Sequence, residues 1–139
     1  MKTISLPARM ENLANLMGFV SSFIRENGFP DERVQELELA TEETLVNIIN
    51  YAYAGRESGD VEIRCHAGEG DALSVEFLDS GVPFDIEAMA DPDLNLSLAD
   101  RKVGGLGVFL IRKMVDEVRH RREGDRNVLT FLIHKPKGK

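Results

Sequence analysis

The stretch DVEIRCHAGEGDALSVEFLD, residues 60–79, carries the pattern that decides the fold. Apolar and polar residues alternate over residues 60–66 and alternate again over residues 72–79. Alternation with a period of two is typical of half-buried strands, and the glycine-containing segment AGEGD between the two runs is typical of a turn. The stretch therefore predicts a β-hairpin with one apolar face.

Helices are expected on the N-terminal side of this hairpin. Apolar residues recur at helical spacing over residues 10–27, and Gly28 and Pro30 end that pattern. A second helix is predicted from Asp31 to about Tyr53. A short strand over residues 3–8 precedes both helices.

The C-terminal side continues the mixture of helix and strand. Residues 83–102 have little periodicity and are expected to form a long loop, after which an apolar helix runs to about Val115. Two further strands are predicted over residues 116–122 and 127–135, and the first contains the basic segment RHRR. That segment is either a solvated strand edge or a contact for an acidic partner. This order of elements predicts a single domain, residues 1–139, with a two-layer α+β architecture.

Composition narrows the class of protein. The 139 residues are 42% hydrophobic and 29% charged, which suits one packed domain. A net charge of −7 argues against nonspecific binding to nucleic acid, because that binding needs basic charge against phosphate. No apolar run approaches the ~20 residues of a bilayer span, and no secretory segment is visible. The single cysteine, Cys65, excludes an intrachain disulfide, so we expect a soluble cytoplasmic protein.

The second helix has an unusual polar side. Glu43 and Asn47 lie one helical turn apart, opposite the apolar stripe. Most such faces are simply solvated. Here the apolar neighbours Leu39 and Val46 flank the polar line, which predicts partial cover by a ligand or a loop. A carboxylate can accept a proton from a hydroxyl, and an Asn oxygen can ligate Mg²⁺.

Two glycine-containing segments are further candidates. Asp79 ends an apolar strand and precedes Gly81, which is typical either of a turn or of a carboxylate at a pocket floor that accepts a bond from an amine. In the second interpretation, Gly81 leaves room for a flat ring. The segment from Gly104 to Gly107 precedes an apolar helix, where backbone N–H groups can bind phosphate.

These three segments together resemble a known superfamily. The segments EETLVNIINYAY (42–53), FLDSGVPFD (77–85) and GGLGVFLIRKMVDEV (104–118) occur in the order and spacing of the N box and the two glycine boxes of Bergerat-fold (GHKL) ATPases. Within that superfamily the chain looks most like the single-domain anti-sigma-factor serine/threonine kinases of bacteria. The resemblance implies a two-layer α/β sandwich with a mixed, mostly antiparallel sheet and helices on one face.

The resemblance also implies an activity, cofactors and partners. A kinase of this kind uses ATP and Mg²⁺, sequesters a sigma factor, and phosphorylates an anti-sigma-factor antagonist, which is a small STAS-type protein. The exchange between these two proteins is called partner switching. A homodimer is the family expectation, without membrane association or direct contact with nucleic acid.

Roles for individual residues follow from the same resemblance. Glu43 matches the catalytic base that activates the acceptor hydroxyl, and Asn47 matches the Mg²⁺ ligand. Asp79 matches the carboxylate that binds the adenine amino group, with Gly81 beneath it. The other residues implied to bind nucleotide are Gly104, Gly105, Leu106, Gly107 and Thr130.

One departure from the family pattern keeps an alternative open. Relatives often have an arginine just before the glycine pair, where this chain has Val103 and Gly104. Arg101 or Lys102 would then have to supply the positive charge. The alternative function is a nucleotide-gated regulatory binding module that transfers no phosphate.

Overall fold

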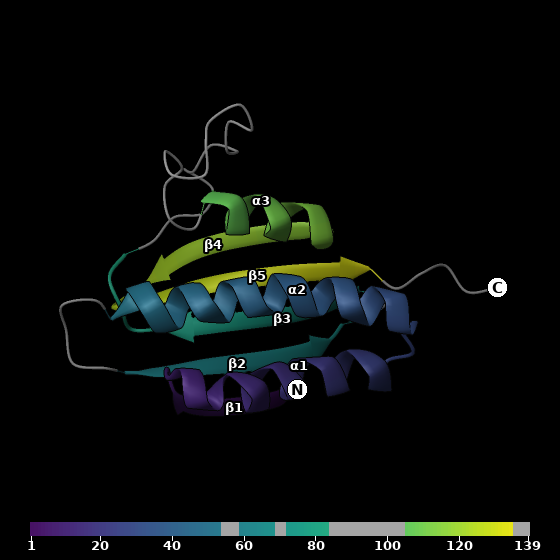
Figure 1. Ribbon diagram of the computed structural model, residues 1–139, viewed down its shortest axis with the longest axis horizontal. Helices are drawn as coiled ribbons and strands as arrows, with labels where there is room; N and C mark the ends of the chain where they lie inside the picture. Colours follow the sequence, from purple (N-terminus) through teal and green to yellow (C-terminus); the bar gives the residue numbers. More distant parts are fainter. Residues whose placement is uncertain (54–58, 69–71, 84–104, 135–139) are drawn as a thin grey trace.

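Five strands form one sheet in the spatial order β1-β2-β3-β5-β4 (Figure 1). The computed structural model describes residues 1–53, 59–68, 72–83 and 105–134. Within these ranges every neighbouring pair of strands is antiparallel, so no parallel pair of the expected mixed sheet is found there. The pairs β2–β3 and β4–β5 are hairpins, which are antiparallel by their connection. The strands are β1 (Lys2–Pro7), β2 (Asp60–Ala67), β3 (Ala72–Asp79), β4 (Glu117–Glu123) and β5 (Arg126–His134).

Helices cover one face of this sheet (Figure 1), which confirms the predicted α+β fold of two layers. A 3₁₀ turn, η1 (Met10–Asn12), leads into α1 (Leu13–Glu26). The second predicted helix differs in its last turn: α2 (Asp31–Asn47) is α-helical, and a π-helical turn, η2 (Ile48–Ala52), continues it. The third helix, α3 (Gly105–Met114), begins within the glycine segment and not after it.

The core lies between the helices and the sheet. Phe77 of β3 and Phe131 of β5 are almost fully buried, and their rings meet edge to face with centroids 5.0 Å apart. The apolar stripe predicted for the second helix is buried along its whole length, because residues at helical spacing share one face. That stripe consists of Val34, Leu37, Thr41, Thr44, Leu45, Ile48 and Ala52.

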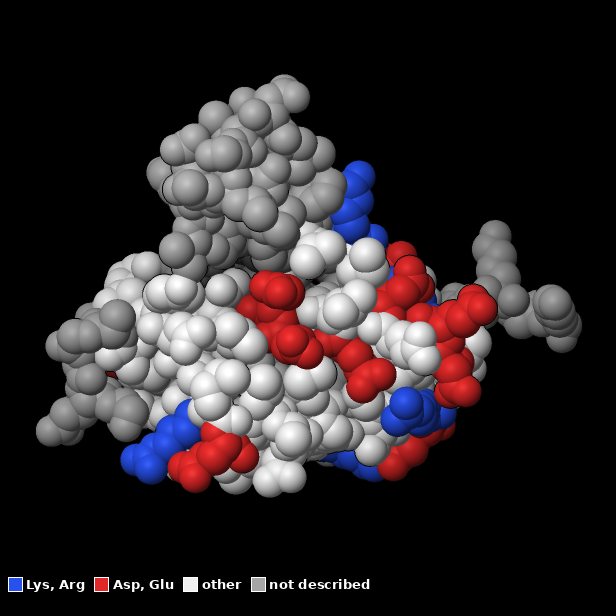
Figure 2. All heavy atoms as spheres, in the orientation of Figure 1, with Lys and Arg blue, Asp and Glu red and all other residues white. Residues whose placement is uncertain are grey.

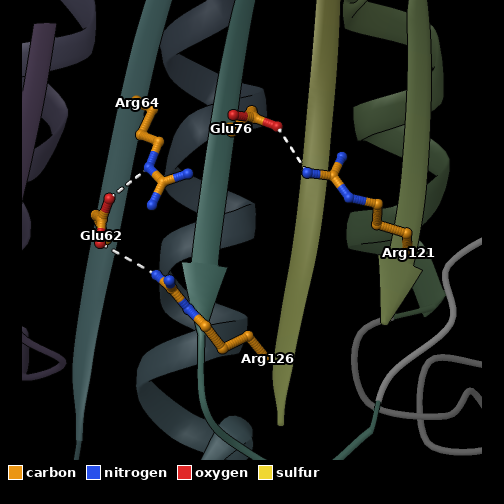
Figure 3. A network of polar contacts seen from close by, with 5 residues as sticks. All are labelled: Glu62, Arg64, Glu76, Arg121 and Arg126. Atoms are coloured by element: carbon orange, nitrogen blue, oxygen red, sulfur yellow. Dashed lines mark hydrogen bonds and ion pairs between the residues drawn. The ribbon is translucent and has the colours of Figure 1, made fainter. Parts of the chain in front are cut away.

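The opposite face of the sheet carries charged side chains (Figure 3). Glu62 of β2 is paired with Arg64 on the same strand and with Arg126 of β5, at 3.1 Å from the latter. These hydrogen bonds, with the one from Arg64 first, lower the pKa of the Glu62 carboxyl. Glu76 of β3 pairs with Arg121 of β4 at 3.4 Å. Pairs of opposite charge across strands allow this face to remain in water without like-charge repulsion.

Some expectations concern residues beyond the described ranges. The predicted loop, apart from Pro83, and the C-terminal tail after His134 fall there. Among the helices that are described, none has both the length and the apolar character needed to cross a membrane.

Candidate active site

Four elements meet at one end of the molecule (Figure 1). The end of β3, the C-terminal end of α2, the start of α3 and the β4–β5 turn lie together there. The predicted site residues come from widely separated parts of the sequence, and most of them belong to these four elements. The antiparallel pairing of β3 and β5 brings these elements together, because β3 ends beside the residues where β5 begins.

The orientation of α3 is fixed at its C-terminal end. Arg33 near the start of α2 donates to the carbonyl oxygen of Met114 and, through Nη2, to Asp116 Oδ2 at 3.2 Å. A cation at this end of a helix also interacts favourably with the helix dipole. Since α3 runs back antiparallel to α2 (Figure 1), its first residue lies about 14 Å further along, beside the half of α2 that carries Glu43 and Asn47.

The side chains of Glu43 and Asn47 are half-buried, whereas Asn50 on the next turn is exposed. In the described residues no hydrogen bond to either half-buried side chain is found, and no group of three or more His, Cys, Asp or Glu forms a metal cage. Acidic side chains gather on the surface over α2 (Figure 2), a helix that contains Asp31, Glu32, Glu36, Glu38, Glu42 and Glu43. The geometry therefore provides a carboxylate and an amide oxygen side by side, with capacity for a ligand.

The end of α2 is tied to the loop that follows β3. The Ala52 carbonyl oxygen accepts from the Val82 N–H at 2.8 Å. The Tyr53 hydroxyl donates to the Asp60 carbonyl oxygen at 2.6 Å and accepts from the Ser80 N–H at 2.9 Å. Burial is the largest cause that raises the pKa of Tyr53 above its ordinary value. A π-helical turn often marks a functional region, and here it presents backbone to the neighbouring loop.

Asp79 is 6% exposed, and its carboxylate is only partly used by the protein. Oδ1 accepts from the Gly81 N–H at 2.9 Å and from Asn127 Nδ2 at 3.0 Å. Neither of these bonds ends on Oδ2, and no other described group bonds to the carboxylate. The bond to Gly81 is the turn that the sequence suggested, and the burial matches a pocket floor as well.

A close contact with the backbone of Ala52 requires glycine at position 81. A Cβ atom at this position would lie 2.1 Å from the Ala52 carbonyl oxygen, which no side chain can tolerate. The sequence interpretation gave a different reason, namely room for a flat ring. The close neighbour that the structure shows is the last turn of the helix.

Asn127 belongs to this end of the molecule and was not predicted. It is 4% exposed, and its amide nitrogen also donates to the Val82 carbonyl oxygen at 2.7 Å. Arg122 Nη1 donates to Asn127 Oδ1 at 3.2 Å and to the Gly81 carbonyl oxygen at 2.9 Å. A signal was available, because Asn127 is in phase with the apolar residues of its strand, and a polar residue at a core position needs a buried partner.

Thr130 is not brought to Asp79. It pairs across the sheet with Glu76 and Arg119. Since successive side chains of a strand point to opposite faces, Thr130 lies on the charged face and Asn127 on the helix face. Of the basic segment RHRR, Arg119 and Arg121 pair with glutamates of their own strand at 2.7 Å, whereas Arg122 donates to Gly81 and Asn127 at the site.

The glycine segment is described in part. Gly105, Leu106 and Gly107 form the first turn of α3. The first N–H groups of a helix have no partner within it, which suits phosphate binding. Gly104, Arg101, Lys102 and Val103 lie outside the described residues.

Comparison with known proteins identifies the family of this chain. The family model for the histidine kinase-like ATPase domain matches residues 6–133. The serine-protein kinase RsbW of Listeria innocua is 30% identical over 137 residues, which cover 95% of this chain and 87% of that protein. The RsbW of Bacillus subtilis is 29% identical over 121 residues, which cover 84% of this chain and 74% of that protein.

Solved structures share the fold. The RsbU and RsbW domains of Rv1364c from Mycobacterium tuberculosis match with a TM-score of 0.68 and 12% identity, over 99% of this chain and 34% of that one. The SiaB–SiaC complex from Pseudomonas aeruginosa matches with a TM-score of 0.55 and 17% identity, over 96% and 89%. With the family match and the RsbW relatives, these comparisons show that the chain belongs to the histidine kinase-like ATPase family and, within it, to the RsbW group of ATP-dependent serine-protein kinases.

Proposed function

We propose that the meeting point of α2, β3, α3 and β5 binds ATP and that Asp79 receives the adenine amino group. The observation that carries this proposal is the buried Asp79 carboxylate, whose Oδ1 is occupied by two donors while Oδ2 has none among the described residues. Oδ2 is not fully enclosed by the described residues, so a ligand amine can reach it and gain a hydrogen bond to the carboxylate. Gly105 and Gly107, at the start of α3, would place backbone N–H groups near the phosphates.

Asn47 fits a role as the protein ligand of Mg²⁺. Its side chain is half-buried beside Glu43 on an acidic helix, and a triphosphate near those carboxylates would be repelled without a cation. Mg²⁺ commonly takes one or two protein oxygens and completes its shell with phosphates and water, so one amide oxygen suffices. When bound, the ion would neutralise charge on the phosphate oxygens.

Glu43 is proposed as the base for the acceptor serine. The hydroxyl proton passes to the Glu43 carboxylate, the serine oxygen forms a bond to the γ-phosphorus, and the bond from that phosphorus to the ADP oxygen breaks. The products are phosphoserine and ADP. The helix holds Glu43 one turn from Asn47, so the proton acceptor and the phosphate-binding groups keep a fixed separation.

For partners, we propose an anti-sigma-factor antagonist as the phosphorylated protein and a sigma factor as the sequestered one. The RsbW relatives and the SiaB–SiaC complex, a pairing of a similar fold with a second protein, support an antagonist partner. We also propose a homodimer acting in the cytoplasm, on the family expectation and the single unpaired cysteine.

Incubation with labelled ATP, Mg²⁺ and purified candidate antagonists tests this function. We expect label on an antagonist serine with the native protein and none with Glu43→Gln, which keeps the shape of the side chain and removes its basicity. Glu42→Gln is the matched control, since Glu42 is an exposed neighbour on the same helix and should leave transfer unchanged. Label transferred equally by Glu43→Gln would remove the base assignment, and nucleotide binding without transfer to any antagonist would favour the regulatory binding module.

A further inference from the structure

We infer that Asn127 and Arg122 are positioning residues of the nucleotide site. Together they hold the Asp79 carboxylate so that one of its oxygens faces the adenine ring of the nucleotide. This inference rests on the proposed ATP site and extends it to two residues from β4 and β5. Arg122 comes from the basic segment RHRR, which is typical either of a solvated strand edge or of a contact for an acidic partner.

Asn127 lies on β5, the strand next to β3, and its side chain contacts Asp79. It lies directly opposite Asp79 in the ladder between β3 and β5 and is 4% exposed. A buried amide is costly unless it is hydrogen-bonded. Its nitrogen donates to Asp79 Oδ1 at 3.0 Å and to the Val82 carbonyl oxygen at 2.7 Å, so both N–H groups are used.

Arg122 decides which way the amide of Asn127 points. Its Nη1 lies 3.2 Å from Asn127 Oδ1 and 2.9 Å from the Gly81 carbonyl oxygen. A guanidinium has donors and no acceptor, so the amide atom that faces it must be the oxygen. The amide nitrogen is then directed at Asp79, and a flipped amide would face donor to donor and acceptor to acceptor.

This chain of donors has a consequence for base selectivity. With Oδ1 held by Asn127 and by the Gly81 N–H, Oδ2 is the oxygen left to accept from a ligand. An exocyclic amine can donate to it, whereas a ring carbonyl in the same place would put two acceptors together. The preference for a nucleobase with an exocyclic amine should therefore depend on Asn127 and, through Asn127, on Arg122.

A purely structural role would give a different result. The same bonds also tie Gly81 and Val82 to the end of the sheet, so a substitution can lower stability without any role in recognition. A loss of stability would lower the affinity for ADP and the affinity for an analogue without the 6-amino group to the same extent. The informative readout is therefore the ratio of the two affinities, measured by titration calorimetry with ADP and with purine riboside diphosphate.

Asn127→Asp is the main test, because it keeps the shape of the side chain and replaces the donor by a second carboxyl. At about pH 8 we expect ADP affinity to fall about tenfold or more and the preference over the analogue to shrink. An unchanged preference would overturn the inference.

Arg122→Gln is the second test, on an exposed residue of β4. We expect a loss of about threefold in ADP affinity and a smaller preference for ADP. Arg119→Gln is the matched control, since it removes the same charge from the same strand on the opposite face. Equal effects of the two substitutions would contradict the inference for Arg122.

The inference and the proposed function can fail separately. If the native protein binds neither nucleotide, the ATP site itself is wrong. If the native protein prefers ADP and Asp79→Asn abolishes that preference, while Asn127→Asp and Arg122→Gln preserve it, the site stands and only the positioning role is wrong.

Discussion

Gly81 and Ala52 approach so closely that only glycine fits between β3 and the end of α2. A Cβ atom on Gly81 would lie 2.1 Å from the carbonyl oxygen of Ala52, and that oxygen accepts the Val82 N–H at 2.8 Å. The contact joins the two segments that carry Asp79 and Asn47. The shape of the proposed nucleotide site therefore depends on a contact between backbones.

Gly81→Ala should destabilise the protein by about 1–3 kcal/mol, because backbone must move to admit the methyl group. Urea unfolding measures this change. Gly18→Ala is the control: Gly18 is exposed within α1 with no atom close to an added Cβ, so this change should stabilise by about 0.5–1 kcal/mol. Equal stability of Gly81→Ala and the native protein would show that the close contact is wrong.

Tyr53→Phe should lower the free energy of unfolding by about 1–2 kcal/mol, because the Asp60 carbonyl and the Ser80 N–H lose a shared partner. Tyr51→Phe, which alters an exposed ring two residues away, should have little effect. Thermal unfolding of both variants separates these outcomes. Similar shifts in the two melting temperatures would argue against the hydrogen bonds of Tyr53.

The raised pKa of Tyr53 predicts a pH dependence in the alkaline range. A folded pKa above the ordinary value of 10.0 means that the folded state holds the phenolic proton more tightly than the unfolded state. The stability contributed by Tyr53 is therefore complete below about pH 10 and is lost as the pH rises further. Urea unfolding across this range should show a shallower decline for Tyr53→Phe, and parallel declines would refute the assignment.

Asn47→Ala should weaken binding of ADP in the presence of Mg²⁺ and leave the weaker binding without Mg²⁺ unchanged, since the amide oxygen serves the ion. Asn50→Ala removes the same group from the exposed next turn and should change neither. Calorimetric titrations with Mg²⁺ and with EDTA give the comparison. An equal loss with and without Mg²⁺ would place Asn47 in contact with the nucleotide and not with the ion.

Cys65 provides a probe of the core. It is fully buried on β2, and burial raises the pKa of its thiol to about 12. Because the thiolate is the reactive form, iodoacetamide at about pH 8 should alkylate the native protein far more slowly than the protein in urea. Mass spectrometry follows the reaction at this single cysteine. Equally fast reaction in both conditions would contradict the burial of β2.

Periodicity in the sequence was enough to predict most of the fold. The stripe from Val34 to Ala52 and the hairpin of β2 and β3 each follow from one local period, 3.6 or 2, which a single segment displays. The π-helical turn at the end of α2 was not predictable in this way. It accompanies a contact with the loop after β3, which depends on tertiary structure.

The candidate site could be predicted from the sequence where two of its residues lie on the same helix. Glu43 and Asn47 share a helix, so their proximity follows from spacing alone. The pairing of Asp79 with Asn127 depends on the register between β3 and β5, which lie 48 residues apart at this point. The position of Thr130 also depends on strand register. The resemblance implied a contact with adenine, whereas the alternation of side chains along β5 places Thr130 on the charged face of the sheet.

Titration calorimetry of the native protein and of Asp79→Asn with ADP and ATP, with and without Mg²⁺, tests the central claim most directly. Asp60→Asn is the control, since it removes an exposed carboxylate from the same end of the sheet. The account predicts Mg²⁺-dependent binding by the native protein and by Asp60→Asn, and a loss of about tenfold or more in Asp79→Asn. Absence of nucleotide binding by the native protein, or equal binding by Asp79→Asn, would contradict it.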